Sequence, residues 1–433
     1  MFNHRQTWQL ALPMIIANIS TPVLGLVDTA MMGHLSSPLY LGAVAIGGMT
    51  FDFLFWGFGF LRMGTTGMTA QAFGQNNVPE IRAILWRALL ISGLISFLIL
   101  LSQKVIGQFG FFLIQSSPEI ENLGLQYFDI RIWSAPATLS LYAISGWLLG
   151  LQNVKAPLAI VITTNLSNIA LDLLFVVKFK WAVEGVALAS VCAEYIGLVL
   201  AIILLLRNKQ FLMRGPVWPE VFQLKKLKAM LYINQNLFIR TLCLIFTFAF
   251  FTTQSARFGE IILAVNTVLL HFQTFLAYTL DGLANAAEVL TGRAIGRKNK
   301  VLLKQAVLTT GLWSLLIAIV FSMIYFFFGK DIIYLLTNLE SVRNTALEYL
   351  PWLLALPLIS FLSFLFDGVF VGATLSKQMR DIMVFSVLGC YLPVYYFNLS
   401  LQNHGLWLAF TCFMVVRSIL MAAFFLKKYK KLC

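Results

Sequence analysis

Long apolar runs separated by short polar connections form the dominant pattern along this chain. A helix that spans a bilayer needs about 20 mostly apolar residues, and the pattern predicts twelve such segments in the 433 residues. The predicted spans lie near residues 8–33, 43–73, 83–102, 123–151, 157–178, 185–206, 230–255, 261–292, 305–328, 342–374, 380–400 and 404–426. The sequence therefore predicts an all-α, multi-pass membrane protein.

Composition also indicates a bilayer as the surroundings. Hydrophobic residues make up 59% of the chain and charged residues 11%, which lies outside the range of an ordinary soluble domain. A net charge of +13 would indicate nucleic acid in a soluble protein, but here the basic residues gather in short connections, as topology signals do. We therefore expect no nucleic-acid partner. The five cysteines are scattered, without CxxC or disulfide-type spacing.

Orientation follows from the same basic residues. When the connections are assigned alternately to the two sides of the membrane, 20 lysines and arginines fall on the side of the N-terminus and 6 on the other side. Cytoplasmic loops carry the excess of Lys and Arg, so both termini are predicted to be cytoplasmic. We expect a multi-pass protein of the cell (inner) membrane.

The longest basic connection lies midway along the chain. We interpret residues 207–228 as a cytoplasmic linker between an N-terminal lobe, residues 1–206, and a C-terminal lobe, residues 229–433. Each lobe contains six predicted spans. Because six is an even number, both lobes have the same orientation, and we expect a pseudo-two-fold axis along the membrane normal between them.

An internal repeat accompanies this division. A shift of about 222 residues places TAQAFGQNN (Thr69–Asn77) on TGRAIGRKN (Thr291–Asn299). The same shift aligns two pairs of glycines, Gly146 with Gly368 and Gly150 with Gly372. Repeated lobes of this kind are typical of secondary transporters, which bind their substrates near the lobe interface.

An aspartate lies within the first predicted span, in the stretch LGLVDTAMMGHL (Leu24–Leu35). A charge in the hydrocarbon is unfavourable, so an intramembrane acid such as Asp28 is a candidate functional residue. Pro13 and Pro22 precede it, and the missing N–H of Pro22 leaves one backbone carbonyl without its helical partner, which predicts a hinge. The structural alternative is a permanent ion pair between Asp28 and an arginine such as Arg62.

The fifth predicted span carries a second polar stripe, TNLSNIALD. Asn165, Asn168 and Asp172 lie at i, i+3 and i+7 and share one helical face. Ser190 of the next span offers another oxygen. Carboxylate and amide oxygens suit a hard cation such as Na⁺, whereas two neighbouring carboxylates can share a proton instead. We therefore predict a site for H⁺ or Na⁺ at Asp28, Asn168 and Asp172. The alternative is ordinary hydrogen bonding between helices by asparagine.

The second half of the chain has a polar stripe of its own. Asp281, Asn285 and Glu288 lie at i, i+4 and i+7 in the eighth predicted span. Asp367 lies in the tenth span and Arg240 in the seventh. Arg240 can neutralise one of these acids, so a structural role and a functional role both remain open for this group.

Motifs of enzymes are missing from the sequence. It contains no GxxxxGK[ST] phosphate loop, no HExxH and no GxSxG, and its four histidines are dispersed. A membrane-embedded transferase would need a catalytic histidine or a cluster of nucleophiles. We therefore predict a transporter that uses an ion gradient and needs no cofactor. The 38 phenylalanines and 14 methionines suit a soft pocket for apolar, cationic guests.

Several stretches resemble one known family. They are GLVDTAMMGHL in the first span, FLRMGTTGMTAQAFG closing the second, GWLLGLQNVKAP after the fourth, NIALDLLF in the fifth, EGVALASVCAEY in the sixth and AVNTVLLHFQTFLAYTLDGLANAAE in the eighth. Together they resemble the multidrug and toxic compound extrusion (MATE) transporters, specifically the DNA-damage-inducible protein F (DinF) branch. The resemblance covers essentially the whole chain.

That resemblance implies both a fold and an activity. The family fold consists of two six-helix bundles around a V-shaped central cleft, and its members export organic compounds in exchange for inward H⁺ or Na⁺. Carried over by position, Asp28 is the coupling carboxylate of the N-terminal lobe. Asn168, Asp172 and Ser190 complete its site.

The second lobe departs from the pattern of the NorM-type branch. That branch pairs a seventh-helix glutamate with a tenth-helix aspartate; Asp367 matches the aspartate, but Arg240 stands where the glutamate is expected. We therefore expect a monomeric, secondary active antiporter, coupled through the first lobe, that exports organic cationic or amphipathic compounds. The alternative is a flippase for a lipid-linked oligosaccharide or peptidoglycan precursor, which would need a cationic cavity to hold pyrophosphate.

Overall fold

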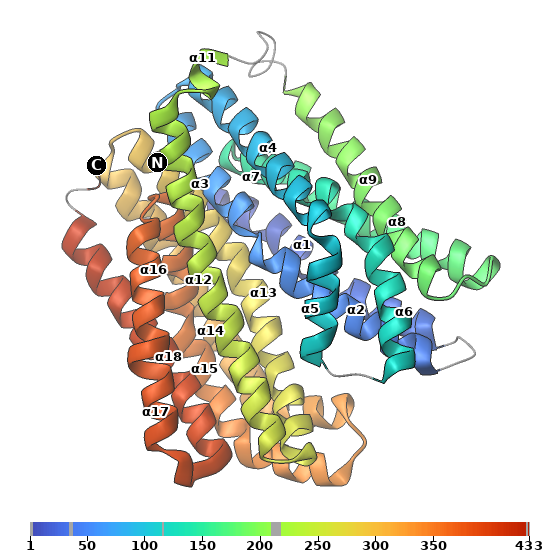
Figure 1. Ribbon diagram of the computed structural model, residues 1–433. Helices are drawn as coiled ribbons and strands as arrows, with labels where there is room; N and C mark the ends of the chain where they lie inside the picture. Colours follow the sequence, from blue (N-terminus) through green and yellow to red (C-terminus); the bar gives the residue numbers. More distant parts are fainter. Residues whose placement is uncertain (1–2, 34–37, 115–116, 209–217, 430–431, 433) are drawn as a thin grey trace. The chain divides into compact units, whose positions relative to one another are not determined.

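The computed structural model describes residues 3–33, 38–114, 117–208, 218–429 and 432, but not the side chains at 23–33, 38 and 112–114. This part of the chain consists of helices joined by short turns and contains no β-strand (Figure 1). Asp28 therefore has a described backbone inside helix α1 (His4–Gly33), whereas its side chain lies outside the described residues.

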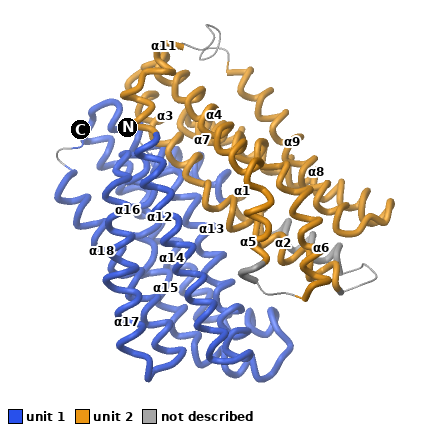
Figure 2. The backbone as a smooth tube through the Cα atoms, viewed as in Figure 1, with its two compact units in different colours: residues 1–15, 231–433 blue, residues 16–230 orange. Residues whose placement is uncertain are grey.

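The chain divides into two compact units (Figure 2). The N-terminal unit comprises residues 16–230, and the C-terminal unit comprises residues 1–15 together with 231–433. The lobes proposed from the sequence, 1–206 and 229–433, differ from these units at the start of the chain. Hydropathy assigns residues to spans in chain order and does not show which later helix the first residues contact.

The first residues belong to the C-terminal unit because of specific side-chain contacts. The Trp8 ring meets the Trp313 ring edge-on with centroids 5.0 Å apart, and Thr7 Oγ1 lies 3.4 Å from Thr309 Oγ1. Farther along α1, Ile15 packs against Gly282 of the C-terminal unit. A Cβ added to Gly282 would lie 2.3 Å from Cγ1 of Ile15.

The helices of the N-terminal unit follow the second part of α1 in chain order. They are α2 (Pro38–Gly57), α3 (Phe60–Gly74), α4 (Val78–Leu101), α5 (Gln103–Ile114), α6 (Pro118–Arg131), α7 (Ala135–Gly150), α8 (Lys155–Asp172), α9 (Val183–Arg207) and α11 (Trp218–Val221). A 3₁₀ turn at Ile132–Ser134 separates α6 from α7, and α8 ends in a π-helical turn at Leu173–Lys178.

The C-terminal unit is built mainly from long helices. They are α12 (Leu224–Arg257), α13 (Glu260–Gly296), α14 (Lys300–Leu336), α15 (Glu340–Gly372), α16 (Ser376–Phe385), α17 (Leu392–Phe397) and α18 (Gln402–Lys428). A π-helical turn at Ser386–Tyr391 joins α16 to α17, and a 3₁₀ turn at Leu399–Leu401 precedes α18.

Nine helical segments in the described part of the chain are long and apolar enough to cross a membrane. They correspond to nine of the predicted spans; the first, fourth and eleventh spans correspond to α1, to α6 with α7, and to α16 with α17. The second and fourth spans are interrupted in the structure, and helix α5 was not predicted. Averaged hydropathy does not detect such breaks. The break before α7 is next to Pro136, which lacks an N–H donor.

The internal repeat has the same backbone contacts in both halves. In the N-terminal unit, a Cβ on Gly146 of α7 would come within 2.5 Å of the carbonyl oxygen of Arg62 on α3. In the C-terminal unit, a Cβ on Gly368 of α15 would come within 2.0 Å of the carbonyl oxygen of Ala284 on α13. One turn later, Gly150 lies against Thr66 and Gly372 against Glu288. Every residue of the second set lies 222 positions after its counterpart, which confirms the repeat.

The linker between the predicted lobes contains ordered structure. Arg87 of α4 is buried and donates from Nε to the carbonyl oxygen of Val221 at 3.1 Å and from Nη2 to that of Glu220 at 2.6 Å. Glu80 accepts from Arg87 at 2.8 Å and from Lys226 at 2.5 Å. These bonds fasten α11, within the proposed linker at 207–228, to α4.

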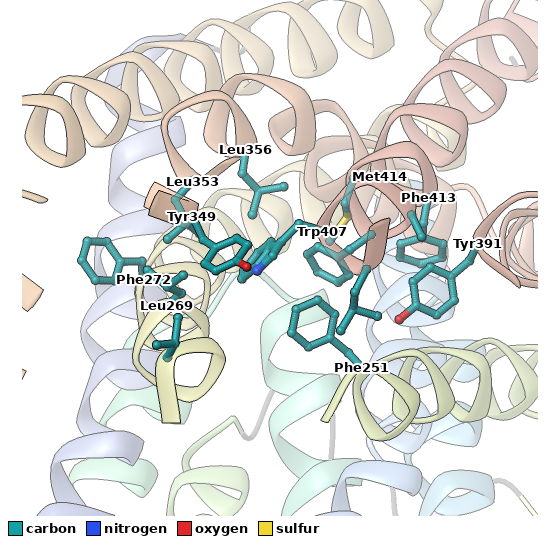
Figure 3. Close-up of a cluster of buried hydrophobic side chains, with 14 of the residues drawn as sticks. Phe251, Leu269, Phe272, Tyr349, Leu353, Leu356, Tyr391, Trp407, Phe413 and Met414 are labelled. Carbon is teal, nitrogen blue, oxygen red and sulfur yellow. The ribbon is translucent and has the colours of Figure 1, made fainter. Parts of the chain in front are cut away.

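An aromatic core fills the C-terminal unit (Figure 3). Trp407 of α18 meets Phe251 of α12 edge-on with ring centroids 5.0 Å apart. Its indole N–H donates to Asn266 Oδ1 of α13 at 2.9 Å, and Asn266 and Asn403 exchange amide hydrogen bonds at 2.7 and 3.1 Å. The polar atoms of this core are therefore paired, as burial among rings requires.

Candidate functional site

Helices α8 and α9 pack together and bring three of the sequence-predicted residues to one place. Asn168 and Asp172 lie one turn apart on α8 and expose 3% and 0% of their surface, and Ser190 on α9 exposes 7%. Asn168 donates from Nδ2 to Ser190 Oγ over 3.5 Å. Asn168 thus joins the polar face of α8 to α9. The side chain of the fourth predicted residue, Asp28, lies outside the described residues.

Helix α1 reaches the same side of α8 one turn earlier. Asn165 donates from Nδ2 to Ser20 Oγ at 3.0 Å, and Ser20 donates in turn to the carbonyl oxygen of Ala17 at 2.7 Å. This contact lies directly before Pro22. Helix α1 runs without interruption through Pro13 and Pro22, so a hinge at this point stays a prediction.

An arginine that the sequence did not connect with the site lies beside Ser190. Arg131, at the end of α6, donates from Nη1 to Ser190 Oγ at 3.1 Å and also to the hydroxyl of Tyr127. Its guanidinium group lies 5.4 Å from the ring centre of Phe51 and 5.6 Å from that of Tyr127. Ser190 therefore accepts from both Asn168 and Arg131. No local spacing reveals this contact, because 59 positions separate the two residues.

Two acids interact electrostatically with the same arginine. Asp52 of α2 and Glu194 of α9 both experience the charge of Arg131, and Glu194 in turn interacts with Tyr142 of α7. Glu194 also lies within one of the predicted spans, at residues 185–206. The structure places it in a group of charged residues around Arg131, next to the cluster of Asn168 and Ser190.

The C-terminal unit holds a buried ion-pair cluster. Asp367 Oδ2 of α15 accepts hydrogen bonds from Nη2 of Arg240 on α12 and from Nη2 of Arg417 on α18. The three residues expose 6%, 7% and 3% of their surface. From the sequence, Arg240 could neutralise one acid here, and its role remained open. Arg417, which lies 50 positions from Asp367, was not named among the candidates.

The polar stripe of α13 is divided between two environments. Asn285 and Glu288 expose 6% and 2% of their surface, and the backbone of Glu288 forms the close contact with Gly372 of α15. Asp281 is exposed and interacts electrostatically with Arg417. The structure therefore brings Asp281 and Asp367 to the same arginine and packs the other two residues between helices.

Ligands for a transition metal do not gather in the described residues. Among them, no group of three or more His, Cys, Asp or Glu side chains could hold a metal ion. The oxygens of the α8–α9 cluster are those of an amide, a carboxylate and a hydroxyl group. Such oxygens suit a proton or a hard cation such as Na⁺.

Comparison with known proteins identifies the family. A family model described as MatE matches the chain twice, over residues 13–174 and 237–397. This chain belongs to the MatE family. Its members are transporters, so the protein is a membrane transporter and not an enzyme. The double match also agrees with the repeat seen in the two halves of this MatE protein.

Curated relatives cover almost the full length of this MatE protein. It is 38% identical to DNA damage-inducible protein F of Escherichia coli K12, over 98% of this chain and 92% of that protein. It is 24% identical to a Thermotoga maritima protein named as a probable multidrug resistance protein NorM, again over 98% and 92% of the two chains.

Solved structures share the fold. A transporter of the MOP superfamily from Pyrococcus furiosus matches with a TM-score of 0.89 at 18% identity, over 99% of this chain and 96% of that one. The Vibrio cholerae MATE transporter VcmN matches with a TM-score of 0.89 at 19% identity, over 99% and 97% of the chains. The predicted all-α fold of twelve membrane helices in two lobes is thereby confirmed.

Proposed function

We propose that this MatE transporter is an antiporter that exports organic, cationic or amphipathic compounds in exchange for H⁺ or Na⁺. The coupling site is formed by Asp28, Asn168, Asp172 and Ser190. The observation that carries this proposal is the burial of Asp172 beside the bonded pair of Asn168 and Ser190. A buried intramembrane carboxylate is unfavourable unless its charge is used or compensated.

The helix register supports a place for Asp28 in this site. The first and fifth spans run in the same direction across the membrane, and the bond between Asn165 and Ser20 fixes their relative height. Asp28 lies eight residues beyond Ser20, and Asp172 lies seven residues beyond Asn165. At 1.5 Å per residue, both backbones advance by roughly 11 Å in the same direction, which brings the two acids to similar depth.

Helix α1 offers a way to convert ion binding into motion. Pro22 lacks an N–H and lies between Ser20, which is bonded to α8, and Asp28. A change of charge at Asp28 therefore acts on the part of the helix beyond its weakest point. Solved MATE structures include a straight and a bent conformation, which is compatible with a helix that bends.

The second unit is less suited to ion coupling. Asp367 is held between Arg240 and Arg417, so its negative charge is compensated without a bound ion. A cation would have to compete with two guanidinium groups for this carboxylate. We therefore infer that the N-terminal unit holds the coupling site and that Asp367 has a structural role.

The exchange of ion for substrate requires that the two ligands bind the two conformations with different affinity. Ion and substrate must either compete for the same carboxylates or favour opposite conformations, because a ligand shifts an equilibrium only through its different affinity for the two states. Protonation or Na⁺ binding at Asp28 and Asp172 bends α1 near Pro22 and releases substrate on the outside. Substrate binding from the inside favours the opposite conformation.

The test is dye efflux from proteoliposomes, with H⁺ and Na⁺ gradients imposed separately. We expect Asp28→Asn and Asp172→Asn each to lower gradient-driven efflux by about tenfold or more, within the range of typical coupling energies. Ser190→Thr keeps the hydroxyl group and should retain transport, whereas Ser190→Ala should reduce it. Asp129→Asn, a change at an exposed acid of α6, is the matched control.

Two outcomes decide between the hypotheses. Full gradient-driven efflux by Asp28→Asn at normal expression would show that the coupling role is wrong. The alternative, a flippase for a lipid-linked oligosaccharide or peptidoglycan precursor, predicts no dye efflux with either gradient and translocation of the lipid precursor instead. The gradient that drives the wild-type protein identifies the coupling ion.

A further inference from the structure

A basic pocket lies in the C-terminal unit where α13 ends and α14 begins. Its volume is about 550 Å³. Three segments of the chain contribute to it: the start of α1, the last turn of α13 and the first turns of α14. Its lining includes Gln6, Arg293, Arg297, Asn299, Leu302 and Gln305.

The charges of this pocket are all of one sign. None of the described lining residues is acidic, and the guanidinium groups of Arg293 and Arg297 repel each other electrostatically. Two arginines that line one cavity offer it several guanidinium N–H donors, which suit an anionic ligand.

The internal repeat provides a control for this argument. At the shift of 222, Gln71 and Gln75 of the first repeat stand where the second repeat has Arg293 and Arg297. The turn that follows is the same in both: Asn77 caps α4 by accepting from the N–H of Glu80 at 3.1 Å. The counterpart Asn299 caps α14 in the same way, accepting from the N–H of Leu302 at 3.0 Å. The fold therefore forms this turn without arginines.

The residues at the centre of each turn agree as well. Asn76 has a φ of 55° and its counterpart Lys298 a φ of 53°, so both turns use the left-handed region at the same position. A general explanation for the arginines is the excess of basic residues in cytoplasmic connections. That explanation accounts for positive charge, which lysine supplies equally, and not for two guanidinium groups directed to one pocket.

We propose that this pocket binds the phosphate of an anionic phospholipid headgroup. Arginine offers paired N–H donors that match phosphate oxygens, and the first turn of α14 adds the positive end of its helix dipole. Helices α13 and α14 are long and apolar enough to cross the membrane, so their connection lies at the bilayer surface. Val301 lines the pocket and exposes 63% of its surface, which suits contact with a lipid.

The experiment compares full-length variants purified in detergent and stripped of lipid. R293Q/R297Q installs the residues of the first repeat, and R293K/R297K keeps the charge, and with it the topology signal, but loses the paired donors. K225Q/K228Q removes two exposed charges from another basic connection and is the control. Bound lipid is measured by native mass spectrometry with dioleoylphosphatidylglycerol, with dioleoylphosphatidylcholine, and with inorganic phosphate as a competitor.

We expect the wild-type and control proteins to retain phosphatidylglycerol in preference to phosphatidylcholine. Each lost guanidinium should weaken binding by about tenfold, as expected for hydrogen bonds to a charged group, and the lysine variant should be intermediate. Equal phosphatidylglycerol binding by wild type and by R293K/R297K would overturn the proposal, even if the glutamine variant does not fold. Displacement by inorganic phosphate at equal concentration would identify free phosphate as the ligand and contradict the lipid.

Discussion

Buried charges in this transporter differ in how they are compensated. Asp367 accepts hydrogen bonds from two arginines, whereas Arg131 donates to the neutral hydroxyl group of Ser190. The sequence identified Asp172, Asp281 and Asp367 as candidates, because an acid in an apolar run is visible without a structure. It did not identify Arg131 and Arg417 as partners, since contacts between distant spans leave no local pattern.

Removal of the acid from the C-terminal cluster should destabilise the protein. Asp367→Ala leaves Arg240 and Arg417 buried without their carboxylate, and loss of one partner from a buried ion pair costs about 3–5 kcal/mol. We expect a clearly lower midpoint of thermal unfolding in detergent. Asp331→Ala, at an exposed acid of α14, should leave the midpoint unchanged. Wild-type stability of Asp367→Ala would argue against a structural role and return Asp367 to the list of coupling candidates.

Contacts between helices could be predicted from the sequence more accurately than helix boundaries. Twelve spans could be predicted from hydropathy, but the break between α2 and α3 and the extra helix α5 could not, because averaging over apolar residues is insensitive to both. The aligned glycines predicted the contacts between helices better than hydropathy predicted the helix boundaries. The shift that aligned glycines in the sequence also aligns the carbonyl groups against which those glycines pack.

These close contacts predict the effect of adding one methyl group. In Gly368→Ala the new Cβ would meet the carbonyl oxygen of Ala284 at 2.0 Å, and in Gly146→Ala that of Arg62 at 2.5 Å. The helices must separate, and such overpacking costs about 1–3 kcal/mol. We expect lower unfolding midpoints for both variants.

Gly93 of α4 is the matched control for these substitutions. Nothing lies within 4 Å of a Cβ built there, so Gly93→Ala should stabilise the helix by up to about 1 kcal/mol through helix propensity alone. If all three alanine variants unfold at the same temperature, the close approach of α3 to α7 and of α13 to α15 would be wrong.

At the scale of the whole molecule, the two halves share a scaffold but not their charges. At the shift of 222 residues, Asp28 corresponds to Phe250 and Asp367 corresponds to Ser145. The family model nevertheless matches both halves. The repeat therefore accounts for the fold, which both halves share, and not for the candidate site, whose acidic residues differ between the halves. This asymmetry is why the fold could be predicted more completely than the site.

The orientation of the molecule can be tested through its last residue. The distribution of basic residues predicts a cytoplasmic C-terminus, so a maleimide that cannot cross the bilayer should label Cys433 in inside-out vesicles only. The other four cysteines are first replaced by serine or alanine. In the same background without Cys433, Ser400→Cys places a thiol in the connection before α18, which is predicted to lie outside and should be labelled in right-side-out vesicles only. Because an even number of spans fixes both termini to one side, labelling of Cys433 from the outside would reverse the predicted topology of every connection, including the basic pocket between α13 and α14.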